Sequence, residues 1–182
     1  PTAAIHTLVS APDRHLLFFG TETTIGTTST QDDMFIRWSD QESIDASTSY
    51  APSATNTAGT QRLADGTRIV GAIRGRDAIY VWTDNALFIM RFVGAPFTFS
   101  FQQVGTGCGL IGKNAAVEVD GSAYWMSENG FFRYTGKLES LSCLVEDYVY
   151  DDLNTVPRQH INAGLNNLFG EVTWFYASSG AT

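Results

Sequence analysis

The sequence is poor in cysteine, since Cys108 and Cys143 are the only two in 182 residues. Two cysteines cannot build the disulfide framework of a small secreted protein, and neither lies in a Cys-x-x-Cys pair. We therefore expect two reduced thiols in a chain that folds in the cytoplasm of the cell that makes it.

Basic residues are scarce as well. The chain has 11 Lys and Arg against 19 Asp and Glu, which gives a net charge of −8 and an isoelectric point near 4.7. Because proteins grip nucleic-acid phosphates with Lys and Arg, this balance argues against tight binding of DNA or RNA. No apolar run approaches the length of about 18 residues that a membrane-spanning helix needs, so no membrane span is predicted.

Motifs that carry chemistry are also missing. The histidines are isolated, and no His-Glu-x-x-His or Gly-x-Ser-x-Gly pattern accompanies them. Gly107–Gly112 matches Gly-x-Gly-x-x-Gly, but the apolar run Ala115–Val119 behind it is too short for the helix that a dinucleotide site requires. The pairs Asp32-Asp33 and Asp151-Asp152 lack the loop spacing of a calcium site. We predict no catalytic residue, no cofactor, no metal and no enzymatic activity.

Two copies of one pattern fill the middle of the chain, at Arg68–Gly105 and Lys113–Cys143. Each copy has four short runs rich in Val, Ile, Phe, Tyr and Trp, separated by turn residues. Asp120-Gly121 and Asn129-Gly130 are typical of type I′ hairpin turns, whose two central residues both need a positive φ. The pattern predicts two consecutive four-stranded antiparallel meanders.

The tryptophans extend this repeat. They recur at intervals close to the roughly 40–50 residues of a four-stranded propeller blade. We take all of them as structural anchors that pack sheets together, namely Trp38, Trp82, Trp125 and Trp174.

The predicted fold is all-β, a β-propeller-like repeat of four-stranded antiparallel blades with long polar loops. Residues 1–182 form one such domain, or a partial propeller of a longer chain. The expected blades span about 61–112 and 113–144, with partial blades at 15–60 and 145–182. Apolar residues at helical spacing predict one short helix within Val145–Leu153.

Two polar excursions, Thr21–Asp33 and Ser39–Thr60, exceed what a blade needs. Loops of this length tend to be functional or mobile, and ordering them costs about 1–2 kcal/mol of backbone entropy per residue. We expect neighbouring chains to order them, and deletion of Ser43–Thr57 to leave the melting temperature nearly unchanged. The candidate interface residues are Ser43, Ser47, Tyr50, Ser53 and Asn56.

Short blocks along the chain resemble the tail proteins of short-tailed phages that are called tail tubular protein B, nozzle or packaged-DNA stabilisation protein. The resemblance runs from about Leu16 to Tyr176, and the order and spacing of the blocks carry it. The blocks are Arg37–Asp40, Arg62–Gly66, Ile69–Gly71, Thr83–Leu87, Phe92–Phe97, Gly105–Gly112, Tyr124–Ser127, Gly130–Phe131, Asp147–Val149, Asp152–Asn154 and Glu171–Tyr176.

The resemblance implies a non-enzymatic virion protein, a β-propeller platform in a hexameric nozzle. Such a ring forms part of the DNA-ejection conduit below the portal and adaptor, and it contacts a tail needle or fibres at its other end. Genomic DNA would pass through it without sequence-specific binding. A net negative charge fits that role, because it repels phosphates and lets the duplex slide.

A ligand- or glycan-binding propeller, or a hydrolase of that fold, is the alternative. Trp82-Thr83-Asp84 resembles part of the Tyr-Trp-Thr-Asp signature of extracellular receptor propellers. Those propellers usually sit among disulfide-rich modules, which this sequence lacks.

Overall fold

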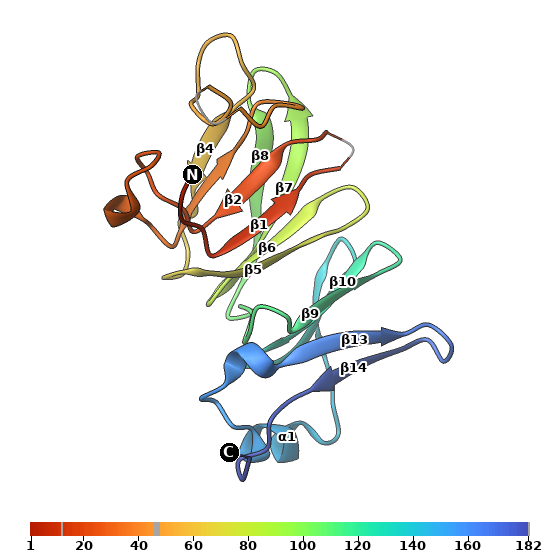
Figure 1. Cartoon of the computed structure of the whole chain (residues 1–182). Helices are drawn as coiled ribbons and strands as arrows, with labels where there is room; N and C mark the ends of the chain where they lie inside the picture. The colour runs from red at the N-terminus through yellow and green to blue at the C-terminus, as the bar shows by residue number, and fades with distance from the viewer. Residues whose placement is uncertain (12, 46–47, 182) are drawn as a thin grey trace.

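The computed structural model describes residues 1–11, 13–45 and 48–181. It is mostly β, with 44% of residues in strands and 7% in helices, which confirms the predicted class. The strands form three antiparallel four-stranded sheets and a two-stranded C-terminal hairpin (Figure 1).

Each sheet is a meander in which strands adjacent in the sequence are adjacent in space. The first sheet contains β1 (His6–Val9), β2 (Leu16–Phe19), β3 (Phe35–Trp38) and β4 (Gly59–Arg62). The second contains β5 (Ile69–Arg74), β6 (Ile79–Thr83), β7 (Ala86–Gly94) and β8 (Thr98–Thr106). The third contains β9 (Ala116–Val119), β10 (Ser122–Ser127), β11 (Gly130–Tyr134) and β12 (Leu138–Leu141). The C-terminal hairpin pairs β13 (Asn162–Asn166) with β14 (Glu171–Phe175).

The first sheet extends beyond the partial blade expected at 15–60. It gains β1 before residue 15, and its last strand is Gly59–Arg62, a segment that straddles the expected start of the next blade at 61. The polar composition of Gly59–Arg62 gave no strand signal, because this segment is a strand only through its pairing with β3. The second and third meanders lie within the expected 61–112 and 113–144.

The first strands of the successive sheets lie beside one another. β1 contacts β5, β5 contacts β9 and β9 contacts β13, and they follow one another down the picture in Figure 1. The backbone N–H of Ala163 also donates to the carbonyl of Asn114 at 2.8 Å, which ties β13 to the segment before β9. The sheets are therefore arranged in chain order about a common line of first strands.

Short helical segments connect the third sheet to the C-terminal hairpin. α1 (Glu146–Asp152) lies inside the predicted Val145–Leu153, and the 3-10 turn η2 (Arg158–His160) precedes β13. Tyr150 fixes α1 to the third sheet, because its hydroxyl donates to the carbonyl of Ser127 at 2.6 Å. Another 3-10 turn, η1 (Thr28–Thr30), lies in the first polar excursion.

Only one of the two expected type I′ turns has the expected residues at its centre. Asp120 and Gly121 both have positive φ, 50° and 85°, as that turn requires. In the other hairpin, Ser127 pairs with Gly130, so the loop residues are Glu128 and Asn129, and Gly130 opens β11. The Asn-Gly pair therefore lies one residue out of the expected register.

The second sheet is buried on both faces, which explains the unbroken apolar run of β6. All five residues of β6 are buried. Ile79 and Val81 pack toward the first sheet, whereas Tyr80 and Trp82 belong to the core shared with the third sheet. Alternate residues of one strand thus supply two different cores.

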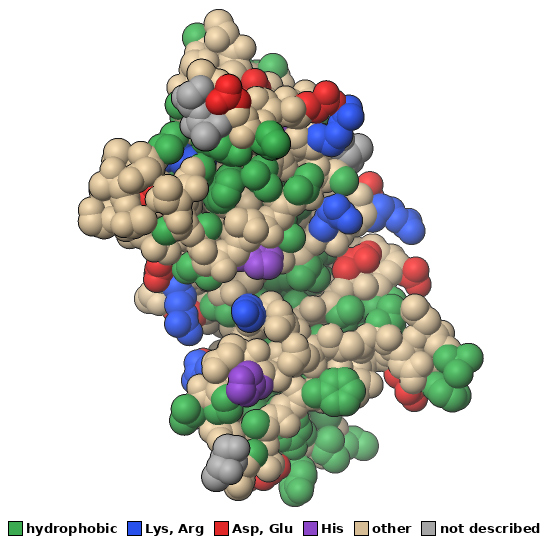
Figure 2. Space-filling model, viewed as in Figure 1, with side chains coloured by type: hydrophobic (Ala, Val, Ile, Leu, Met, Phe, Trp, Pro, Cys, Tyr) green, Lys and Arg blue, Asp and Glu red, His purple; other side chains and the backbone are tan. Residues whose placement is uncertain are grey.

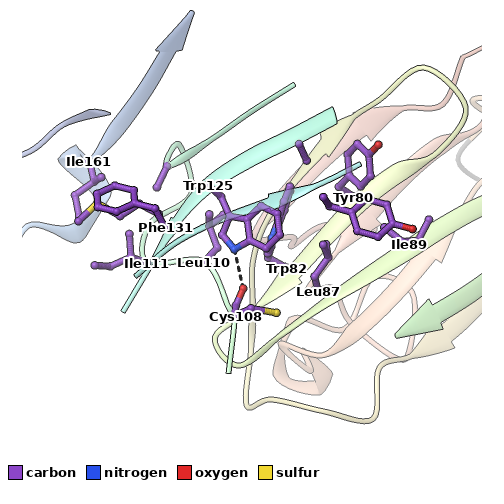
Figure 3. Packing of buried hydrophobic residues seen from close by; sticks show 14 of the residues in the cluster. Tyr80, Trp82, Leu87, Ile89, Cys108, Leu110, Ile111, Trp125, Phe131 and Ile161 are labelled. Carbon is purple, nitrogen blue, oxygen red and sulfur yellow. Dashed lines mark hydrogen bonds between the residues drawn. The ribbon is translucent and has the colours of Figure 1, made fainter. Parts of the chain in front are cut away.

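Trp82 and Trp125 are fully buried and face each other in the core between the second and third sheets (Figure 3). Their ring centroids are 5.4 Å apart in an edge-to-face arrangement. The two tryptophans do not occupy equivalent positions in their sheets, because the turn after β10 aligns Trp82 with Met126 rather than with Trp125. Because side chains alternate between faces, this offset of one residue turns the two rings toward each other.

The sheets, arranged in chain order, form what we call the stack. The other two predicted anchors lie toward its two ends. Trp38, on the third strand of the first sheet, packs against Phe99 and Phe101 of the second sheet. Trp174 is half-buried on β14 and contacts Phe131 of the third sheet at 5.0 Å. Every anchor therefore bridges two sheets.

Replacing either central ring should destabilise the whole stack. We expect Trp82→Ala and Trp125→Ala each to lower the free energy of unfolding by about 3–5 kcal/mol, as for other large-to-small core changes. Urea denaturation followed by circular dichroism measures this. Phe169→Ala, at an exposed position, is the control and should leave the midpoint unchanged.

Phenylalanine substitutions separate the two rings further. The Nε1 of Trp125 donates to the carbonyl of Cys108 at 2.7 Å, whereas the buried Nε1 of Trp82 has no hydrogen-bond partner among the described residues. Trp125→Phe should therefore cost about 1 kcal/mol more than Trp82→Phe, the contribution of one hydrogen bond. Equal costs in the same urea experiment would contradict this assignment.

Candidate functional site

Both polar excursions fold back against the first sheet. The ring of Tyr50 packs edge-on against Phe18 of β2 with a centroid distance of 5.4 Å. Phe18 belongs to the face of the first sheet that points away from the second sheet, since its neighbours Leu17 and Phe19 lie in the shared core. The excursions thus partly cover an outer face of the stack.

Arg37 holds the two excursions together. Its buried guanidinium donates to the carbonyls of Tyr50 at 3.0 Å, Thr23 at 2.8 Å and Glu22 at 3.3 Å. One carbonyl comes from the second excursion and two from the first. A single β3 side chain therefore supplies donors to backbone from both loops.

Asp40 and Thr57 close the second excursion at its base. Asp40 Oδ1 accepts hydrogen bonds from the Thr57 N–H at 2.8 Å and the Thr57 hydroxyl at 2.6 Å, and these bonds hold the pKa of Asp40 below its usual value. The Thr57 carbonyl accepts from Trp38 Nε1 at 2.9 Å and from the Thr98 hydroxyl at 3.0 Å. The loop is thus linked to both the first and the second sheet.

The structure describes four of the five candidate interface residues. Tyr50 is only 8% exposed, so it is an internal contact of the first sheet rather than a surface one. Ser43 is half-buried against the hydroxyl of Ser49. Ser53 is exposed and Asn56 half-buried, and they bond to each other and to the loop backbone. Ser47 lies outside the described residues.

Glu22 anchors the first excursion and the N-terminal segment. Its buried carboxylate accepts from the N–H groups of Thr2 at 2.5 Å, Ala3 at 3.0 Å and Gly26 at 3.1 Å, and from the Thr21 hydroxyl. Burial alone would raise the pKa of Glu22, but these backbone donors outweigh it and hold the pKa well below its usual range.

A groove of about 370 Å³ lies where the first strands of the second and third sheets begin. Five separate segments line it, and four of them lead into the first strand of a sheet or of the C-terminal hairpin. The lining residues are Ile5, Asp33, Arg68, Ile69, Val70, Ile111, Gly112, Lys113, Arg158 and Gln159. We call this surface the basic groove.

Two glycines allow the segments around the basic groove to approach closely. A Cβ on Gly112 would overlap the carbonyl of Arg158, and one on Gly71 would press on Leu110 and the backbone of Lys113. Residues 112–113 therefore pass between β5 and the turn before β13. This explains the last glycine of the Gly-x-Gly-x-x-Gly match, which leads into β9 and not into a helix.

The charges of the basic groove are only partly compensated. Arg158 pairs with Glu128, whereas the exposed side chains of Arg68 and Lys113 have no ion pair within the described chain. Asp33 contributes one carboxylate. Burial lowers the pKa of the nearby His6, a backbone hydrogen bond with Ala72 opposes that shift, and the charge of Lys113 lowers it further.

Sequence reasoning missed the basic groove because its cations are scattered along the chain. Arg68, Lys113 and Arg158 come together only when the first strands align. The one available signal was that Arg68 and Lys113 open the two copies of the repeat, at corresponding places.

One carboxylate of each acidic pair and the buried His15 have structural partners. Asp32 forms an ion pair with Arg62 at 2.6 Å, and Asp152 bonds to the hydroxyl of Ser179. Buried His15 lies with Nδ1 2.8 Å from the carbonyl of Ser39. Among residues 1–11, 13–45 and 48–181, no three His, Cys, Asp or Glu side chains are placed to hold a metal ion.

No family model matches the chain, and no curated protein is significantly similar to it. In the part of the chain that the structure describes, no helix is long and apolar enough to cross a membrane. The two cysteines are free thiols, Cys108 buried and Cys143 half-buried. Burial raises the pKa of the Cys108 thiol.

Removing Arg37 should loosen both excursions at once. We expect Arg37→Met to lower the free energy of unfolding by about 2–4 kcal/mol, because each buried carbonyl left without a donor costs about 1–3 kcal/mol. Faster amide hydrogen exchange in residues 21–33 and 48–57 should accompany it. Arg91→Met, at an exposed arginine, is the control. Exchange confined to one excursion would contradict the role of Arg37 as their common anchor.

Acid should release the N-terminal segment through Glu22. Its pKa in the folded protein lies below its unfolded value near 4.5, so its stabilisation is complete above that pH and is lost as the pH falls through the folded pKa. Glu22→Gln should therefore destabilise the protein at pH 7 and have progressively less effect below pH about 4. Melting curves at several pH values measure this, with Glu42→Gln at an exposed position as control.

Proposed function

We propose that this chain is a structural component of a phage tail, a hub of the nozzle or tail tube. In this role it forms part of the DNA-ejection conduit and links the portal and adaptor to the tail tip or fibres. Its sheets act as blades of a β-propeller. The observation that carries the proposal is the alignment of the first strands β1, β5, β9 and β13, since propeller blades place their first strands around the central axis.

The blocks that resemble the tail proteins support the proposal, because their residues have structural roles in this fold. In Arg37–Asp40, Arg37 anchors both excursions, Trp38 bridges two sheets and Asp40 closes the second loop. In Thr83–Leu87, Asp84 accepts from the N–H of Thr67 at 2.8 Å and so holds the link between the first and second sheets. The resemblance thus falls on residues that fix loops and sheet connections.

The outer face of the first sheet supports assembly into a ring. Val9 is 51% exposed there, and Leu16, Phe18 and Phe35 are only half-buried. Figure 2 shows hydrophobic side chains gathered over β1 and β2. In the proposed hexamer a second copy of the chain covers this face, and the exposed tip of the second excursion around Ser53 meets the same neighbour.

Native mass spectrometry and negative-stain imaging test the assembly. We expect a ring of six copies with a central opening. Val9→Glu should abolish the ring while the melting temperature of the subunit stays unchanged, because an exposed residue adds little to subunit stability. Lys137→Glu, an exposed position on the turn before β12, is the matched control.

A monomer at all protein concentrations would contradict the proposal and favour the ligand-binding alternative. A hexamer that tolerates Val9→Glu would retain the ring but place its interface elsewhere.

A further inference from the structure

The basic groove is a local exception to the charge of the molecule. The chain carries a net charge of −8, yet the groove gathers three cations against one carboxylate. Arg68 and Lys113 have no ion pair within the described chain. The exposed Arg74, Arg76, Arg91 and Lys137 also have none there, but of these six unpaired cations only Arg68 and Lys113 line the groove. Cations left unpaired beside a groove are available for a ligand.

The lining is mixed, which restricts the chemistry of that ligand. Ile5 and Val70 are at least partly exposed there, with Ile69 and Ile111 buried beneath them. An inorganic anion would make no use of this aliphatic surface. A peptide with an acidic residue beside aliphatic ones would use both, because a guanidinium matches a carboxylate in two parallel hydrogen bonds.

Nucleic acid fits the groove less well. Binding to a phosphate backbone needs a basic track that follows successive phosphates. Here Asp33 lies in the groove itself, and Asp32 and Glu128 stand nearby as the partners of Arg62 and Arg158. These acids limit the positive surface to a single site.

We propose that the basic groove binds an acidic peptide segment of a partner protein. Arg68 and Lys113 hold a carboxylate of the peptide, and its aliphatic neighbours lie on Ile5 and Val70. Asp33 repels a second carboxylate placed close to the first. We therefore expect the acidic residues of the peptide to be separated along its sequence. This inference concerns a site within one chain and does not depend on the hexamer.

Selection from a random heptapeptide display library on the immobilised protein tests the proposal. Selected sequences should share an Asp or Glu flanked by Ile, Leu or Val. A fluorescein-labelled selected peptide should then bind in an anisotropy titration. Arg68→Ala with Lys113→Ala should weaken binding roughly tenfold or more, since the carboxylate of the peptide then loses both of its cationic partners.

The matched control is Arg74→Ala with Arg76→Ala, which removes two exposed arginines outside the groove and should leave the affinity unchanged. Circular dichroism verifies that both double variants fold. The same peptide with Asn or Gln in place of its acid should bind at least about tenfold more weakly. Rising salt should weaken binding, because the charges are exposed.

Three results would overturn the proposal: no enrichment of peptides, enriched peptides without an acidic residue, or affinity that the Arg68/Lys113 variant leaves unchanged. Displacement of the peptide by inorganic phosphate, but not by chloride at the same ionic strength, would reassign the groove to a free anion. Displacement of the peptide by a short DNA duplex would reassign the groove to nucleic acid if the Arg68/Lys113 variant also fails to bind that duplex.

Discussion

The contact between the second and third sheets depends on two tryptophans that meet across it. Trp82 and Trp125 are both fully buried, and residues of the connection from β8 to β9, among them Cys108, Leu110 and Ile111, fill the space around them (Figure 3). Since the second sheet also carries the core shared with the first, losing this contact affects every sheet. The interior of the molecule is therefore two cores on opposite faces of one central sheet.

Local sequence patterns predicted the strands of the second and third sheets because each strand contains its own signal. The run Ile79–Trp82, the Asp120-Gly121 turn and the helical spacing within Val145–Leu153 need no distant partner to be recognised. Gly59–Arg62 has no such signal, because its residues are polar and only the neighbouring β3 makes it a strand. The offset of Trp125 also escaped prediction, since a register of one residue depends on where the hairpin turn lies.

The candidate site could be predicted less well, for a related reason. Arg68, Lys113 and Arg158 are ordinary surface cations in the sequence, and tertiary packing alone brings them to one groove. The polar excursions carried a clearer compositional signal, but their Ser and Thr content concealed that Glu22, Arg37 and Asp40 tie them to the first sheet. Composition identified these segments as loops and gave no information about how they are fixed.

Arg37 binds both excursions through backbone carbonyls, a group that every amino acid possesses. Substitution of Thr23 or of the residues around Tyr50 leaves those acceptors in place as long as the backbone path is kept. Many outward-facing side chains of these loops can therefore be substituted without loss of the hydrogen bonds that fix the loops. Such a loop suits a protein whose contacts diverge faster than its fold, as the hypervariable loops of binding proteins do on their conserved scaffolds.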